Sequence, residues 1–157
     1  MPKEEKMENS RFKFRAWDAE RKRYCIDRKW VEYRHKKDGT MIAVNYQRGS
    51  GGKEQELVVE QYTGLKDCNG VEIYEGDIVE FTYWWFDGNE AESQLTGEIV
   101  YLTDCMSFGL KGVKNKEWLA HIGGSDSDTA AFATWLFEGA DFSVLGNIHE
   151  SPELLPQ

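Results

Sequence analysis

Residues 61–81 read QYTGLKDCNGVEIYEGDIVEF and hold two turn signals between runs of alternating apolar residues. Asn69 and Gly70 favour a hairpin with a type I′ turn, since both tolerate the positive φ angles that its two central positions need. Asp67 stands where its side chain can accept hydrogen bonds from the amides of this turn. A second tight reversal is expected around Gly76, which would take a backbone conformation closed to residues with a Cβ.

The chain then continues IVEFTYWWF, whose period of two and β-branched and aromatic residues predict a strand. One face of this strand would carry Val79, Phe81, Tyr83 and Trp85. The opposite face would carry Ile78, Glu80, Thr82 and Trp84. Asp87 and Gly88 mark a hairpin tip. The partner strand is expected at residues 93–103, with Gly97 as a candidate bulge site.

The same stretch resembles the signature of the YopX family, small proteins encoded mainly by bacteriophages and prophages. The matching letters are YTGLKD-x-NG-x-EIYEGDIV. Residues 14–18, FRAWD, resemble the opening motif of that family, and residues 146–155, GNIHESPELL, resemble its closing motif. The likeness spans roughly residues 11–155. It departs from the family at Ser151, where Asn is commoner, while Cys68 occupies a position that varies.

The resemblance implies an SH3-type β-barrel or roll in the later part of the chain and a phage or prophage origin. It implies no established activity. The motif and turn residues that it assigns to this sequence are Tyr62, Gly64, Leu65, Asp67, Asn69, Gly70, Tyr74, Gly76, Asp77, Gly146, Asn147 and His149.

Short strands separated by glycine-rich turns predict a mainly β fold, with at most one or two short helices. Further strands are expected at residues 11–17, 24–26, 30–33, 41–46, 57–59, 106–110, 118–122 and 142–148. A short helix is expected at residues 129–137, after an N-cap cluster at 125–128. The loop RGSGGK at residues 48–53 suggests a division into a strand-rich segment, 1–52, and an SH3-like domain, 53–157.

The composition fits a folded chain without a membrane anchor. Its 157 residues are 40% hydrophobic and 13% aromatic, which is enough for a packed core. No run approaches the roughly 18 apolar residues that a membrane helix needs, and the N-terminus has no apolar core of a signal peptide. Cys25, Cys68 and Cys105 lack the spacing of a zinc site or a disulfide framework. They favour a reducing compartment, the cytoplasm of a bacterial host cell.

The net charge of −9 is unevenly distributed. Residues 1–37 contain 13 basic and 7 acidic residues, which leaves 6 basic and 21 acidic residues for the rest of the chain. This basic arm could hold nucleic acid, although the acidic remainder repels it. The alternative, which we favour, is that the arm lies across acidic surface of its own chain or of a neighbour. Its densest basic cluster, Arg21-Lys22-Arg23, is expected to face solvent.

The sequence offers little chemistry. His35, His121 and His149 lack the mutual spacing of metal ligands, and no serine, cysteine or lysine nucleophile signature is present. Residues 48–53 lack the following Ser or Thr and the helix that a phosphate loop needs. The acidic trio Glu72, Glu75 and Asp77 matches no calcium-loop spacing, and we expect Asp77 to hydrogen-bond the amides of its own turn. No catalytic residue, cofactor or metal is therefore expected.

Trp84 and Trp85 are adjacent on the predicted strand, so one of them must point away from the core unless a second layer covers it. Such exposed aromatics favour self-association or docking to a protein partner over base stacking. The sequence therefore predicts a non-enzymatic accessory protein that acts as an interaction module and forms homo-oligomers. The alternative is a nucleic-acid-binding factor that uses Trp84, Trp85 and the cluster at residues 21–23.

Overall fold

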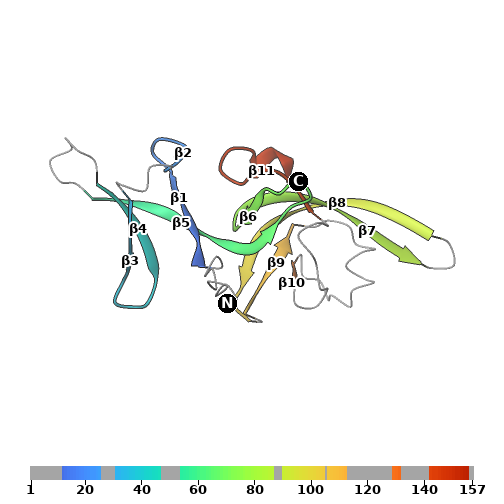
Figure 1. The fold of residues 1–157 in the computed structure, drawn as a ribbon, viewed down its shortest axis with the longest axis horizontal. Coiled ribbons are helices and arrows are strands. Elements are labelled where there is room, and N and C mark those ends of the chain that lie inside the picture. The colour runs from blue at the N-terminus through green and yellow to red at the C-terminus, as the bar shows by residue number, and fades with distance from the viewer. Residues whose placement is uncertain are drawn as a thin grey trace, which may run out of the picture. The chain divides into compact units, whose positions relative to one another are not determined.

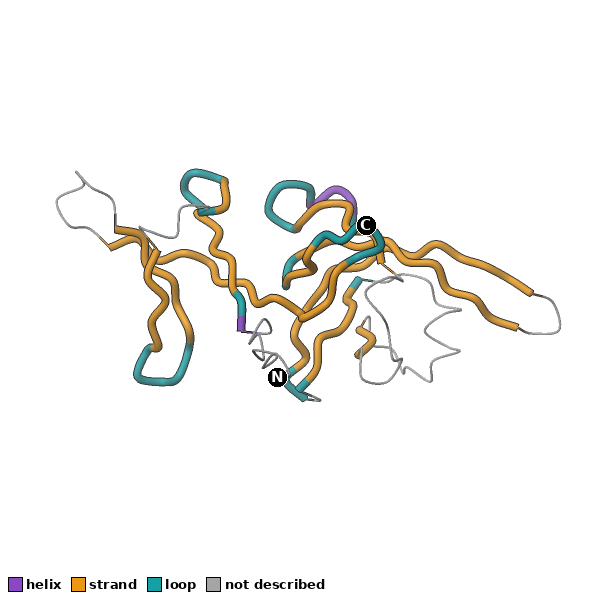
Figure 2. Tube along the Cα trace, viewed as in Figure 1, coloured by secondary structure: helices purple, strands orange, loops and turns teal. Residues whose placement is uncertain are grey.

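The computed structural model describes residues 12–25, 31–46, 54–86, 90–104, 106–112, 129–131 and 142–155. The chain divides into two compact units, Met1–Gly64 and Leu65–Gln157. Antiparallel strands make up nearly all of the regular structure (Figures 1 and 2), so the predicted mainly β fold is confirmed. None of the helices within the described residues is long and apolar enough to cross a membrane.

The N-terminal unit is built from five strands that pair in the order β2-β1-β5-β4-β3. Their bounds are β1 Phe14–Asp18, β2 Arg23–Tyr24, β3 Val31–His35, β4 Met41–Tyr46 and β5 Glu54–Lys66. Ala16, Ala43 and Leu57 form the buried centre of this unit. The strands expected near residues 11–17, 24–26, 30–33, 41–46 and 57–59 are therefore present, and the last of them is much longer than its sequence pattern suggested.

The long strand β5 explains where the two units divide. It pairs with β1 from Val58 to Gln61 and with β4 from Glu54 to Leu57. These ladders tie the residues after the 48–53 loop to the N-terminal strands, whereas the sequence placed the boundary at that loop. The division instead falls between Gly64 and Leu65.

The C-terminal unit contains a five-stranded antiparallel sheet in the order β10-β9-β8-β7-β11, and β6 pairs with β5. The bounds are β6 Glu72–Tyr74, β7 Asp77–Phe86, β8 Glu90–Leu102, β9 Ser107–Lys111, β10 Thr129–Ala131 and β11 Phe142–Asn147. A 3-10 helix, η4 Pro152–Leu154, follows β11. This order of strands is compatible with the SH3-like roll that the resemblance implies.

The hairpin turn between β5 and β6 is not of type I′. Gly70 has a φ of +81°, but Asn69 is not among the residues with positive φ. The Gly70 amide donates to the Asp67 carbonyl (2.9 Å) and the Asp67 amide to the Val71 carbonyl (2.8 Å), the pattern of a three-residue loop that ends in a left-handed glycine. The turn between β3 and β4 repeats this pattern with Gly39.

Two further expectations are wrong in their details. Thr129–Ala131 is a strand rather than the start of a helix, because its backbone pairs with residues 109–111 of β9. Gly97 lies in an uninterrupted ladder opposite Val79, and the register shift of this sheet falls instead between Val144 and Gly146.

Several expectations fall outside the described residues. They are the loop at 48–53, the hairpin tip at 87–88, Cys105, the strand at 118–122 with His121, the N-cap cluster at 125–128 and residues 132–137 of the expected helix.

The core of the C-terminal unit forms where the two runs of the 61–81 stretch meet the rest of the sheet. It consists of Ile73, Val79, Phe81, Leu95, Ile99, Leu110 and Phe142. The rings of Phe81 and Phe142 meet edge to face, with their centroids 5.8 Å apart. Val79 and Phe81 lie in the same core, as the predicted alternation requires.

Replacing Phe142 by Ala is expected to lower the free energy of unfolding by about 3–5 kcal/mol, because it removes a fully buried ring and leaves a cavity. Chemical denaturation followed by circular dichroism measures this loss. The control is Val71→Ala in the same unit, where the side chain is 48% exposed. That variant should change stability by less than about 0.5 kcal/mol, and equal losses for the two would contradict the assigned core.

Candidate functional site

The turn after β5 is fastened by the carboxylate of Asp67, which is only 5% exposed. Its Oδ1 accepts the amides of Asn69 and Val71, both at 2.8 Å. Its Oδ2 accepts the amide of Val144 in β11 at 3.0 Å, and the Cys68 amide donates to the Phe142 carbonyl beside it. The carboxylate therefore joins a local turn to the last strand of the sheet.

Burial raises the pKa of Asp67, but the hydrogen bonds from the amides of Val144, Val71 and Asn69 outweigh it, and the pKa lies below its usual range. The charged form is therefore the one that fits this site. With three backbone donors on its two oxygens and little exposure to solvent, this carboxylate serves the turn rather than a substrate or metal.

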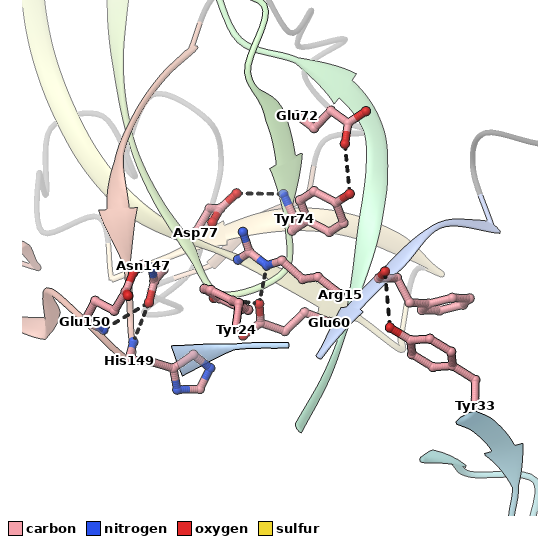
Figure 3. A network of polar contacts seen from close by, with 11 residues as sticks. Arg15, Tyr24, Tyr33, Glu60, Glu72, Tyr74, Asp77, Asn147, His149 and Glu150 are labelled. Carbon is pink, nitrogen blue, oxygen red and sulfur yellow. Dashed lines mark hydrogen bonds and ion pairs between the residues drawn. The ribbon is translucent and has the colours of Figure 1, made fainter. Parts of the chain in front are cut away.

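The second reversal is held in the same way (Figure 3). Asp77 accepts the amide of Tyr74 at 2.8 Å, as the sequence led us to expect, and is itself buried. The Gly76 amide donates to the Ile99 carbonyl in β8, and the Gly76 carbonyl accepts the amide of Ile148, both at 2.9 Å. The φ of +76° at Gly76 allows its peptide groups to reach both sides.

The closing motif folds back on itself after β11. The Asn147 side-chain oxygen accepts the amides of His149 and Glu150, both at 3.0 Å, while its nitrogen donates to the Glu150 carboxylate at 2.7 Å (Figure 3). A Cβ at Gly146 would lie 3.2 Å from the Ser151 hydroxyl and from a methyl of Leu154. Glycine at this position thus lets η4 approach the strand.

The remaining motif residues also have structural surroundings. Tyr62 is buried, with the Lys13 ammonium 5.8 Å from the centre of its ring. Gly64 takes a φ of +91° within β5, and Leu65 packs against the core of the C-terminal unit. The acidic trio is not assembled as an ion site, since Glu72 accepts the hydroxyl of Tyr74 at 2.9 Å. The described part of the chain brings no three His, Cys, Asp or Glu side chains together as a metal site.

Four of the described basic residues in the N-terminal unit form ion pairs with carboxylates of that unit. Arg15 pairs with the buried Glu60 at 2.6 Å, and Tyr24 donates to the same carboxylate at 3.0 Å (Figure 3). Two further pairs are Arg34 with Glu32 at 3.0 Å and Lys36 with Glu56 at 2.7 Å. These residues belong to strands and turns of a folded unit rather than to a free arm.

Arg21 differs from its two neighbours in the Arg21-Lys22-Arg23 cluster. It forms a 2.6 Å ion pair with Asp18, which is 1% exposed and also accepts the Arg21 amide and the Gln55 side chain. Lys22 and Arg23 are exposed, as expected.

Sequence reasoning did not single out the buried Asp18 and Glu60. The signal at Asp18 was an aspartate placed directly between a strand and a charged turn, where it can accept turn amides. Glu60 has no such local signal.

Trp84 and Trp85 lie in the part of β7 that pairs, among the described strands, with β8 alone. This segment, residues 82–86 of β7 with residues 90–94 of β8, is called the ribbon below; its register runs from Thr82↔Gln94 to Phe86↔Glu90. The pairing of β11 with β7 ends at Phe81, and that of β9 with β8 ends at Glu98. Figure 1 shows β7 and β8 continuing together beyond these strands.

Comparison with known proteins finds one matching family and similar solved structures. A sequence model of the family described as YopX protein matches residues 13–156. The crystal structure of protein EF1440 from Enterococcus faecalis is 29% identical, with 92% of this chain and 97% of that chain covered and a TM-score of 0.49. The protein yopX from Bacillus subtilis is 20% identical, with coverages of 91% and 97% and a TM-score of 0.49. A search of curated proteins finds no match.

Replacing Asp67 by Asn should lower the free energy of unfolding by roughly 1–3 kcal/mol, because the amide nitrogen cannot accept the hydrogen bond that one carboxylate oxygen now receives. Thermal and denaturant unfolding measure this loss. The matched control is Asp38→Asn in the related turn between β3 and β4, where the carboxylate is exposed and accepts hydrogen bonds from the amide and the side chain of Thr40. A loss at Asp38 as large as that at Asp67 would contradict the role of burial.

Stability should also depend on pH in a defined direction. Burial raises the pKa of Asp18, but its hydrogen bonds and the charge of Arg21 outweigh that effect, and the pKa lies below its usual value. Asp18 and Asp67 therefore both have depressed pKa values. Their contribution is present above the unfolded pKa of about 3.9 and is lost as pH falls through the folded values. Unfolding measured between pH 7 and pH 2 should show this loss below about pH 4, with a shallower slope in Asp67→Asn. An unchanged slope in that variant would argue against the assignment.

Proposed function

The chain belongs to the YopX family, and we propose that it is a non-enzymatic phage or prophage accessory protein, a protein-interaction module that associates with further copies of itself through the ribbon. It would act in the cytoplasm of the bacterial host, where thiols such as the free Cys25 and Cys68 stay reduced. The proposal assigns the motif turns to folding and the ribbon to function.

The observation that carries this proposal is the length of the β7–β8 pairing. Two strands without further neighbours are marginally stable in water, so a ribbon that extends beyond its sheet calls for additional contacts. Its β7 strand has the sequence TYWWF, and large aromatic residues dominate the energetics of protein interfaces. No described strand other than β8 pairs with residues 82–86.

The polar motif side chains are hydrogen-bonded within the fold, which supports a role in binding a protein over a role in catalysis. Asp67, Asp77 and Asn147 direct their side chains to backbone amides, so these motif residues serve to fix turns. The ion pairs of Arg15 and Arg21 use cations that a nucleic-acid site would need, and the net charge of −9 opposes the approach of phosphate. We therefore place nucleic-acid binding second.

Light scattering at micromolar concentration tests the proposal directly. The unaltered chain should form an oligomer, and the double variant Trp84→Ala/Trp85→Ala should shift toward the monomer, because it removes the largest apolar surface that the ribbon can offer a partner. Tyr101→Ala is the control: this aromatic lies on β8 outside the ribbon, is 44% exposed and should leave the mass unchanged.

Two results would contradict the proposal. One is a strict monomer across the concentration range. The other is salt-sensitive binding of labelled oligonucleotides that is lost in Lys22→Glu/Arg23→Glu, which would favour the nucleic-acid alternative. These two exposed cations are better probes than deletion of residues 1–37, because the deletion would also remove β1, β2 and β3.

A further inference from the structure

We propose that residues 82–86 of β7 pair edge to edge and antiparallel with the same residues of a second copy, which makes one continuous sheet of the two ribbons. This inference rests on the proposed self-association and names the surface and geometry that produce it. It follows from the direction of the backbone groups along β7.

The direction of these groups is fixed by two hydrogen bonds. In an antiparallel strand, the N–H and C=O of one residue point to the same side, and successive residues alternate. The Ile99 carbonyl accepts the Gly76 amide and so points toward β7. Because successive residues alternate, the backbone groups of Leu95, four residues before Ile99, also point toward β7. The backbone groups of its partner Phe81 therefore point toward β8.

The second hydrogen bond lies on the other side of β7 and gives the same answer. The Val144 amide donates to Asp67, away from β7, so Val144 and its partner Val79 do not bond to each other. The backbone groups of Val79, like those of Phe81, therefore point toward β8. It follows that the backbone groups of Thr82, Trp84 and Phe86 point away from β8, to the side on which no described residue pairs with them.

Two other edges of this sheet are less suited to pairing. The outer side of β11 is occupied by Asp67, which accepts the Val144 amide, and by the Cys68 amide, which donates to the Phe142 carbonyl. In the ribbon, the backbone groups of Glu90 and Glu92 point away from β7, and charged residues on an edge strand hinder it from pairing with a second copy of itself. The β7 segment has no charge, proline or bulge among the described residues.

The second copy is the occupant that this charge pattern favours. A two-fold axis sets each strand against itself, so a strand with carboxylates would repel its counterpart in a chain of net charge −9. The sequence TYWWF meets no such repulsion. Centred on Trp84, the pairing would place Trp84 opposite its own counterpart and Thr82 opposite Phe86, with aromatic pairs across the new ladder.

Amide hydrogen exchange, resolved by residue in NMR spectra of the full chain, tests this geometry. At high concentration, exchange at Thr82, Trp84 and Phe86 should be slowed by on the order of tenfold or more relative to a dilute sample. Tyr83 and Trp85, which bond to β8, are internal controls for the ladder, and Gln94 reports the opposite edge and should stay unchanged.

The outcomes separate the inference from the proposed function. An oligomer without slowed exchange at these three amides would overturn edge pairing while self-association stands. A monomer at every concentration would overturn both. Slowed exchange in a monomer would mean that another part of the same chain covers this edge, and the inference would again be wrong.

A matched pair of proline variants gives a second test. Thr82 and Gln94 lie opposite each other in the ladder, and each amide points away from the other strand, to a side where no described residue pairs with it. Thr82→Pro removes a donor from the proposed interface and should shift the protein to the monomer, whereas Gln94→Pro should remain associated. Circular dichroism confirms folding of both variants, and association of Thr82→Pro equal to that of the unaltered chain would overturn the inference.

Discussion

The C-terminal unit depends on one buried carboxylate. Asp67 takes three backbone amides, two from its own turn and one from a strand 77 residues later in the chain. Removing a carboxylate from water is costly unless it is hydrogen-bonded, and here the amides supply that compensation. Because the three amides occupy both oxygens, the turn after β5 and the position of β11 are set together rather than independently.

The same device recurs wherever the family motif appears. Asp18 accepts two amides of the turn after β1, Asp77 accepts the amide of Tyr74, and Asn147 accepts two amides after β11. Each is a short polar side chain at a strand end, where the backbone leaves the ladder and its amides need new acceptors. The motif residues of this chain therefore fix where its strands begin and end. This role explains why they do not converge on a reactive site among the described residues.

Local patterns in the sequence predicted the local structure well. The alternation in MIAVNY and IVEFTYWWF gave β4 and β7, and Gly76 took the positive φ that its turn required. One failure concerns a feature that distant residues decide. Thr129–Ala131 follows an apparent N-cap but pairs with β9. The type of the hairpin turn at Gly70 was also predicted wrongly, although this turn is local.

The candidate site shows the same division. Arg21 is exposed, as its basic sequence neighbours indicated, but its ion pair with Asp18 could not be predicted, because Asp18 is also held by Gln55, which lies in another strand. The pairing of Arg15 with Glu60 likewise depends on β1 lying beside β5. The two adjacent tryptophans could be read directly from the sequence. The sequence did not predict that the last described pair between β11 and β7 is at Phe81.

The fold and the proposed interface follow from one constraint. Asp67 and Cys68 use the outer donors and acceptors of β11, so that strand cannot recruit another along residues 142–144. The ladder between β11 and β7 ends at the same place, opposite Phe81, while β7 continues to Phe86. Beyond Phe81, no described strand besides β8 pairs with β7. In a chain that is 30% charged, this segment of β7 is uncharged, and the acidic residues of the ribbon belong to β8.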